Sequence, residues 1–220
     1  YGAIGDGVAD DTASIQKYAN FLMSNGGGVL RFPKGNYRIT GTIKIDGKVS
    51  IVGERGAKIT VDANVEPFEI RNATGQGMTG LEIDGKDRAF YGMSIWNTEY
   101  YLIDNVHIHN TGGTIPMRGD GSGIRLIDSS FILITRTKTI DIGGDGILTL
   151  QSKYVVIDGC WSERCKRHNY SFSEYQAKKY SEHCKLINSV GIDAVLSGID
   201  LESGVRCIVD NNTFIRSGKY

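Results

Sequence analysis

A short unit, glycine followed by alternating apolar residues, recurs along the chain and constrains its fold more than any other feature. The interval between glycines is 31, then 23, then 52 residues, and the last is about two steps of the same size. A further copy is therefore expected near residue 169, where Asn169–Phe172 has the same alternation. The unit is found in Gly92–Ile95, Gly123–Leu126, Gly146–Thr149 and Gly198–Leu201.

A second unit, which ends strand-like segments in Asp or Asn, is interleaved with the first. Its copies are Ile103–Asn105, Ile157–Gly159, Ile187–Ser189 and Asp210–Asn212. Two short-strand units that both return every 22–31 residues or so are typical of a parallel β-solenoid, in which each coil stacks on the one before. A leucine-rich repeat lacks support because its L-x-x-L-x-L frame is absent. The sequence thus predicts an all-β parallel β-helix.

A single helix is expected near the N-terminus, over residues 11–24. Asp10 to Thr12 supply capping side chains, apolar residues recur at helical spacing, and the glycines at 26–28 stop the helix. Period-two segments follow at 29–32, 37–39, 42–45, 49–52 and 58–61. We therefore expect one domain over 1–220, with residues 1–28 capping the coils of 29–220. Because no capping element ends the chain, we expect it to be part of a longer polypeptide.

Composition excludes several classes of function. The 25 basic and 25 acidic residues give a formal net charge of zero, so no nucleic-acid partner is expected. No run of about 18 apolar residues occurs, so no membrane insertion is expected. The cysteines Cys160, Cys165, Cys184 and Cys207 contain no C-x-x-C pair. We interpret them as buried thiols, and no metal or cofactor is expected.

The opening residues carry a family resemblance. Residues 1–16 read Y-G-A-I-G-D-G-V-A-D-D-T-A-S-I-Q, and residues 26–37 read G-G-G-V-L-R-F-P-K-G-N-Y. Both segments resemble the N-terminal signature of right-handed parallel β-helix proteins of the pectate-lyase superfamily. That superfamily includes phage tail spikes, mannuronan C5-epimerases, pectin-degrading enzymes and capsule depolymerases. The resemblance implies a capped right-handed β-helix but names no catalytic residue.

The catalytic signatures of these enzymes are not intact. The stretch best aligned with the epimerase Y-G-F-D-P-H segment is Asp145–Leu150, which has no matching Asp or His. The polygalacturonase N-T-D, D-D, G-H-G and R-I-K set and the pectate-lyase W-I-D-H segment are missing too. The chain therefore looks most like a bacteriophage tail spike or appendage. This resemblance implies a homotrimer, contact with other virion or tail proteins, and location on the virion or outside the cell.

Two carboxylates form the leading catalytic hypothesis. If Ile199 and Leu201 point into the core, Asp200 and Glu202 share the outer face of one strand. Two such carboxylates suit glycoside hydrolysis, one as acid and one as base or nucleophile. Glu174 on the preceding coil is a third candidate. The competing interpretation is a pair of solvated carboxylates on an exposed strand.

Aromatic and basic residues supply candidates for substrate binding. An aromatic ring can stack on a pyranose, and Trp96 aligns with the outward positions of Ile127 and Leu150 in later coils. Trp96 can therefore be a sugar platform or a contact between chains. Arg167 and His168 belong to a basic stretch that can attract an anionic polymer. The remaining aromatic candidates are Tyr100, Trp161, Tyr170 and Tyr175.

The favoured function is binding, and in its stronger form hydrolysis, of a bacterial cell-surface polysaccharide or teichoic acid. One alternative is a non-catalytic shaft or carbohydrate-binding module. Another is a secreted bacterial polysaccharide lyase or hydrolase unconnected with phage. The sequence leaves these alternatives open.

Overall fold

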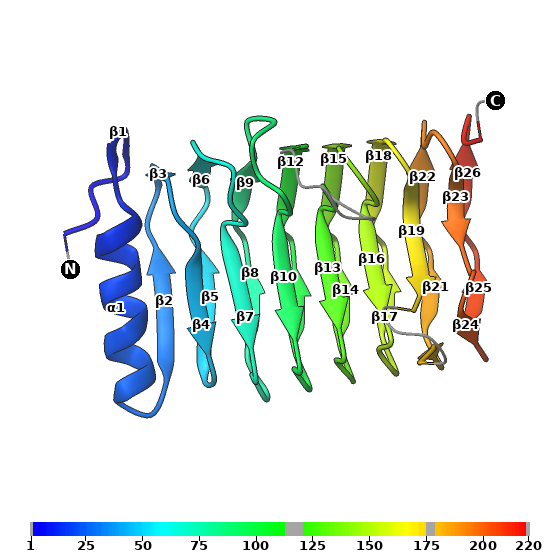
Figure 1. Ribbon diagram of the computed structural model, residues 1–220, viewed down its shortest axis with the longest axis horizontal. Helices are drawn as coiled ribbons and strands as arrows, with labels where there is room; N and C mark the ends of the chain where they lie inside the picture. The colour runs from blue at the N-terminus through cyan, green and yellow to red at the C-terminus, as the bar shows by residue number, and fades with distance from the viewer. Residues whose placement is uncertain (1, 113–120, 175–178, 219–220) are drawn as a thin grey trace.

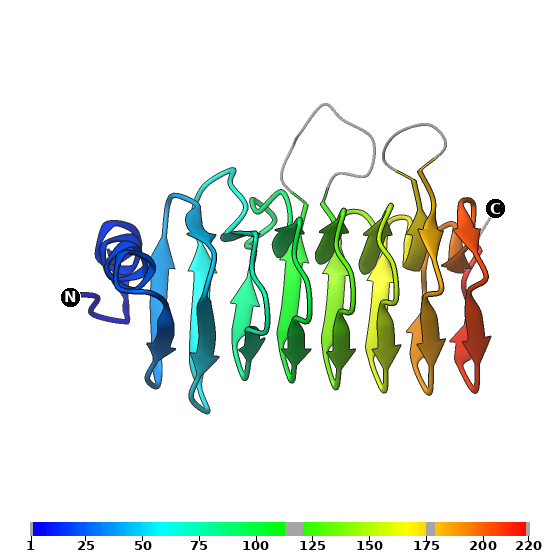
Figure 2. The same cartoon turned by 90° about the horizontal axis from the view of Figure 1, so that it is seen from below.

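The computed structural model describes residues 2–112, 121–174 and 179–218, which form a parallel β-helix of about eight turns. One helix, α1 (Thr12–Ser24), covers its first coil (Figure 1). The termini lie at opposite ends of the long axis, and the coils follow one another between them (Figure 2). The predicted β-helix with an N-terminal helix is confirmed.

Three parallel sheets run along this axis in the described part of the chain, and each coil contributes one strand to each sheet. The nine-stranded sheet comprises β1 (Asp6–Asp10), β3 (Gly35–Ile39), β6 (Ala57–Val61), β9 (Glu82–Asp84), β12 (His107–Thr111), β15 (Lys138–Ile142), β18 (Trp161–Cys165), β22 (Val190–Ile192) and β26 (Thr213–Ile215). The eight-stranded sheet comprises β2 (Gly28–Phe32), β5 (Val49–Gly53), β8 (Gly77–Thr79), β11 (Leu102–Asp104), β14 (Leu133–Thr135), β17 (Val156–Asp158), β21 (Lys185–Ile187) and β25 (Ile208–Asp210). The seven-stranded sheet comprises β4 (Ile43–Asp46), β7 (Phe68–Arg71), β10 (Met93–Trp96), β13 (Ile124–Ile127), β16 (Ile147–Leu150), β19 (His168–Ser173) and β23 (Ser197–Asp200). A short sheet pairs β20 (Ser181–Glu182) with β24 (Gly204–Val205).

The glycine unit marks one register position of the seven-stranded sheet. Ile124 pairs with Ile147, which pairs with Tyr170, so the copy expected near residue 169 lies in β19 as predicted. A Cβ at Gly123 would lie 2.6 Å from the backbone oxygen of Gly146 on the next coil. Glycine recurs there because a Cβ at most of these positions would meet the backbone of the next coil, although Asn169 occupies the same position in β19.

The second unit marks turns with a left-handed backbone. Asn105, Asn188 and Asn211 all have φ of 51–52°, a region that Asn adopts more readily than most residues. The Nδ2 of Asn211 donates to Oδ1 of Asn188 at 2.7 Å, and the Nδ2 of Asn188 donates to Oδ1 of Asp158 at 2.8 Å. The turns of successive coils are thus joined side chain to side chain.

Apolar side chains fill the interior. The inward positions of neighbouring strands stack into columns such as Ile45, Ile70, Ile95 and Leu126, each almost wholly buried. Burial of such a side chain contributes about 1.5–3 kcal/mol, so the core column is the main stabilising feature. Cys160, Cys165 and Cys184 are buried, and all four cysteines are free thiols.

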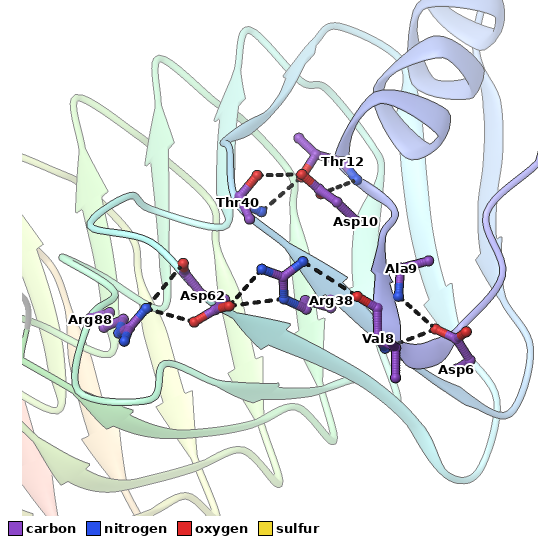
Figure 3. Close-up of polar contacts among 9 residues, drawn as sticks. All are labelled: Asp6, Val8, Ala9, Asp10, Thr12, Arg38, Thr40, Asp62 and Arg88. Atoms are coloured by element: carbon purple, nitrogen blue, oxygen red, sulfur yellow. Dashed lines mark hydrogen bonds and ion pairs between the residues drawn. The ribbon is translucent and has the colours of Figure 1, made fainter.

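The N-terminal segment is attached to the first coils by polar contacts. Asp10 accepts hydrogen bonds from the backbone and hydroxyl of Thr12 and from Thr40 (Figure 3). Arg38 bridges the Val8 carbonyl and Asp62. Asp62 also pairs with Arg88 from a later coil, so charged side chains connect three coils across the outside of the nine-stranded sheet.

Asp11 plays a different part from the helix cap that the sequence indicates. Its buried carboxylate accepts the backbone N–H groups of Ile4 at 2.7 Å and Gly5 at 3.1 Å, and it caps no helical N–H. Asp10 supplies the helix cap through its bond to the Thr12 N–H. Asp10 thus caps the start of the helix, whereas Asp11 binds the backbone of the segment that precedes it.

The glycine column yields a stability prediction. Gly123→Ala should lower the free energy of unfolding by at least about 1–3 kcal/mol, the usual cost of overpacking, because the new Cβ meets a backbone that cannot move aside. Gly47→Ala is the control: Gly47 lies in a half-buried bend with no atom within 4 Å of an added Cβ, so the substitution bears only the cost of the positive φ. Urea denaturation of both variants checks this, and equal losses would contradict the packing argument.

Candidate functional site

The outer face of the seven-stranded sheet presents two straight rows of side chains. Residues that alternate with the buried column of Ile70 and Ile95 point away from the core. Register places one residue of each row on each coil, so a row runs along the axis with about 4.8 Å between coils. The first row is Lys44, Glu69, Ser94, Arg125, Leu148, Ser171 and Asp200. The second row is Asp46, Arg71, Trp96, Ile127, Leu150 and Ser173.

Two glutamates at the N-terminal end of this face, Glu66 and Glu69, are coupled and are called the glutamate pair below. Burial raises the pKa of Glu66 to about 7, opposed by a hydrogen bond with Ser94 and reinforced by the hydrogen bond and charge of Glu69. The pKa of Glu69 is lowered: burial opposes this shift, but Arg71 and Glu66 outweigh it. Near neutral pH a substantial share of Glu66 is therefore protonated beside a Glu69 that is ionised.

A ring of contacts around Trp96 fixes this pair. Trp96 Nε1 donates to Ser94 Oγ at 3.1 Å, and Arg71 Nε donates to Glu69 Oε1 at 2.6 Å. The guanidinium carbons of Arg71 and Arg125 lie 4.7 Å and 5.3 Å from the Trp96 ring centroid. Since β7 and β13 flank β10, the arginines reach the ring from the two neighbouring strands. The Trp96 ring therefore lies against two cations beside the glutamate pair, and its role as a sugar platform stays a prediction.

The middle of the face is apolar. Trp96 packs against Ile127, Leu148 and Leu150, which form a cluster separate from the main core. Register pairs Trp96 with Ile127 and Ile127 with Leu150, as the sequence alignment predicts.

A second polar group, called the Asp145 cluster, lies at the C-terminal end and comprises Asp145, Arg167, His168 and Asp200. Asp145 is completely buried; its Oδ1 accepts the His168 N–H at 3.0 Å and lies 3.6 Å from Arg167 Nε. Burial raises the pKa of Asp145, and Arg167 opposes the shift. His168 Nε2 lies 3.9 Å from Asp200 Oδ2.

Asp200 lies on the outer face as predicted, but Glu202 does not share its strand. Strand β23 ends at Asp200, and Leu201 is 44% exposed where the sequence places it in the core. The Glu202 N–H donates to Asp200 Oδ1 at 3.1 Å, which turns the chain. Glu202 is therefore an exposed turn residue. Glu174 is likewise exposed and follows the end of β19.

The remaining aromatic candidates are not gathered on this face. Tyr170 is fully buried and its hydroxyl donates to the Val190 carbonyl, so the expectation of ring stacking with a sugar is corrected. Trp161 lies on β18, in a different sheet, with its Nε1 bonded to Glu163. Tyr175 lies outside the described residues.

Tyr100 belongs to a stack of exposed rings at another corner. Its ring centroid lies 4.8 Å from that of Phe131, which lies 4.9 Å from Tyr154, which lies 5.2 Å from His183. The rings are within 5–7° of parallel, so each covers its neighbours' faces. Leu102 and Leu133 are exposed nearby in the chain. The stack presents ring edges to the surroundings.

The sequence reasoning missed the glutamate pair. The alternation of Phe68–Arg71 matches that of Met93–Trp96 one coil later, and this signal could have placed Glu69 beside Ser94. Glu66 carries no such signal, because it lies before the strand and its environment comes from side chains of other coils.

Two searches of the described residues bear on other site types. They contain no group of three or more His, Cys, Asp or Glu side chains placed to hold a metal ion. Within the same residues no helix has both the length and the apolarity needed to cross a membrane.

Comparison with known proteins finds two kinds of relative for this chain. The chain is 36% identical over 103 residues to mannuronan C5-epimerase AlgE2 of Azotobacter vinelandii, which covers 39% of this chain and 10% of the epimerase. It is 28% identical over 172 residues to the SPbeta prophage-derived uncharacterized protein YomE of Bacillus subtilis, covering 70% of this chain and 26% of that protein. The chain thus spans a small part of the curated relatives it matches.

Solved structures share the fold at low identity. An exopolygalacturonase from Thermotoga maritima superposes with a TM-score of 0.76 at 16% identity, covering 99% of this chain and 65% of the enzyme. Gene product 12 of bacteriophage phi29, in its pre-mature form, superposes with a TM-score of 0.73 at 18% identity, covering 99% and 32%. The fold is therefore related to phage proteins and to polysaccharide-acting enzymes.

Family models agree with the architecture. Residues 1–67 match the pectate-lyase-like model of rhamnogalacturonase A and epimerases, and residues 57–220 match the right-handed β-helix region. The second match covers most of the chain. On this evidence the chain belongs to the right-handed parallel β-helix family.

Proposed function

We propose that the outer face of the seven-stranded sheet binds a bacterial cell-surface polysaccharide and hydrolyses it at the glutamate pair. Glu66 is the general acid and Glu69 the base or nucleophile. The observation that carries this proposal is the opposite displacement of the pKa values of two coupled, partly buried carboxyl groups at one end of this face. Environments that push two carboxyl groups apart in this way are typical of acid–base pairs.

The chemistry follows from these positions. A protonated Glu66 can give its proton to a glycosidic oxygen, while the ionised Glu69 stabilises or attacks the positive charge that develops at the anomeric carbon. Arg71 keeps Glu69 ionised through its 2.6 Å contact. The two carboxyl groups share a hydrogen bond, so a glycosidic bond that enters between them must separate them to the roughly 5–5.5 Å of a retaining pair.

Asp200, Glu202 and Glu174 remain a rival catalytic assignment. Asp200 is the strongest of the three, because it lies on the same face and next to His168. Glu202 and Glu174 lie in exposed positions beyond the ends of β23 and β19. Variants of Asp200 and Glu202 therefore accompany those of the glutamate pair in the test below.

Assembly on a virion, as a homotrimer, is part of the same proposal. The similarity to YomE and to the phi29 protein supports association with phage particles or other tail proteins. The exposed rings of Tyr100, Phe131 and Tyr154 supply an apolar strip along the axis. Sedimentation velocity of the chain should then give a trimer, and a sole monomer at high concentration would contradict this part.

The catalytic proposal predicts a loss of activity at defined positions. Glu66→Gln and Glu69→Gln should each lower the rate at which envelope polysaccharides or teichoic acids release new chain ends by at least about a hundredfold, the usual scale of acid–base catalysis. The wild-type rate should fall as pH rises through about 7, where Glu66 loses its proton. Reducing-end release and phosphate-ester cleavage are measured together.

The controls separate the alternatives. Glu99→Gln, which removes a glutamate at a different corner of the coils, should leave the rate unchanged. A loss of activity in Asp200→Asn but not in Glu66→Gln would assign catalysis to the Asp145 cluster instead of the glutamate pair. An unsaturated product would indicate a lyase. Binding without any cleavage by the wild type would establish the non-catalytic shaft instead.

The raised pKa of Glu66 also predicts a pH dependence of stability that needs no substrate. A carboxyl group whose pKa rises from 4.5 when unfolded to about 7 when folded binds more protons in the folded state between these values. Its contribution to stability is complete below about 4.5 and is lost as pH rises through about 7. Glu66→Gln should therefore gain stability relative to wild type between pH 5 and pH 8, as measured by urea denaturation. A constant difference would show that Glu66 titrates normally.

A further inference from the structure

The Asp145 cluster contains polar atoms that the described chain leaves without hydrogen-bond partners. Asp145 Oδ2 and Arg167 Nε are both buried and neither has a partner. A buried polar atom without a hydrogen bond is destabilising, more so when it is charged. Two such atoms within one ion pair, whose Arg167 Nε lies 3.6 Å from Asp145 Oδ1, therefore require a functional explanation.

The backbone of Arg167 is held firmly while its guanidinium is left available. Arg167 N–H donates to the Gly144 carbonyl at 3.1 Å, and the Arg167 carbonyl accepts the Leu196 N–H at 2.9 Å, so coils on both sides fix it. The side chain is 35% exposed, while its counter-ion Asp145 is wholly buried. The buried Asp145 carboxylate thus lies beside Arg167 Nε, while the rest of the Arg167 side chain is partly exposed.

Polar side chains near Arg167 are engaged with one another. His168 follows it at the start of β19, with Nδ1 within 2.7 Å of Ser197 Oγ, which itself donates to the Ile199 carbonyl. The buried Ser171 Oγ lies on the first outer row beside Asp200, to which it donates. Anion recognition therefore depends on the planar Arg167 guanidinium, which is suited to bind the oxygens of a carboxylate or a phosphate.

We propose that Arg167, positioned by the buried Asp145, binds an anionic group on a repeat unit of the glycan that occupies this face. The inference rests on the proposed function and deepens it by naming an acidic substrate. Ser171 lies four coils from Glu69 along the first row, or about 19 Å at 4.8 Å per coil. The anion is bound away from the glutamate pair, so an extended acidic chain is held at a second point.

The test measures binding in a Glu66→Gln background, where hydrolysis does not consume the ligand. Three probes are titrated calorimetrically: polygalacturonate for carboxylates, poly(glycerol phosphate) teichoic acid for phosphates, and dextran as a neutral chain. Arg167→Gln should weaken binding of the anionic probe by at least about tenfold, the equivalent of one charged hydrogen bond. The probe that responds identifies carboxylate or phosphate as the group recognised.

Lys166→Gln is the matched control. It removes the same charge from the adjacent exposed position, and it should change affinity by less than about threefold, the modest effect of an exposed charge. Equal losses in both variants would reduce the effect to general attraction and overturn the proposal. So would dextran binding as tightly as the anionic probes, or no binding of any anionic probe.

A double-mutant cycle examines the positioning role of Asp145. Asp145→Asn keeps the shape of the side chain but removes the counter-charge, so it should weaken anion binding when Arg167 is present and have little effect in Arg167→Gln. Independent effects would contradict positioning. Circular dichroism and thermal unfolding accompany each variant. Failure of the proposed hydrolysis would be seen as intact polymer with wild-type protein, whereas failure of this inference would be seen in the affinities.

Discussion

The in-register parallel pairing of successive coils is the constraint on which the rest of the structure depends. Each strand donates and accepts backbone hydrogen bonds with the coil before and the coil after, and the glycine column lets these backbones approach closely. A shift of one residue would exchange the buried and exposed side chains of a whole strand. The register that fixes the core therefore also fixes the rows on the outer face. The coil to which a residue belongs sets the position of its side chain along the axis.

This regular stacking explains how a chain with zero net charge forms local clusters of charged side chains. Outward positions on neighbouring coils are about 4.8 Å apart, so charged residues one or two coils apart in sequence meet on the surface. Arg71 and Arg125, two coils apart, both reach Trp96 in this way, and Glu69 pairs with Arg71 on the same strand. Asp145 and Arg167 meet at the other end of the face. Partial burial then strengthens the interactions between these charges, because water no longer screens them fully.

The strand pattern and the helix could be predicted because they depend on local periodicity. The segments around β2 to β6 and the fourth copy of the glycine unit all appear where alternation places them. The prediction that Glu202 shares a strand with Asp200 was wrong because β23 ends at Asp200, two residues early, where the Glu202 N–H binds the Asp200 side chain. Tyr170 is aromatic and was therefore a candidate for stacking on a sugar, but it occupies an inward-facing position of its strand and is buried in the core. Alternation alone identifies strands more securely than it identifies where they end.

The sequence by itself determined the coil period, the glycine contacts and the capped β-helix, because each follows from residues close together in the chain or repeated at a constant interval. Only the tertiary structure decided which polar side chains meet. Glu66 gains its raised pKa from burial and from Ser94 and Glu69, on its own and the next coil. Asp145 becomes a buried counter-ion because Arg167 folds over it from the following coil. Burial and the proximity of charges are properties of the assembled coils, so they cannot be predicted from residue type or spacing.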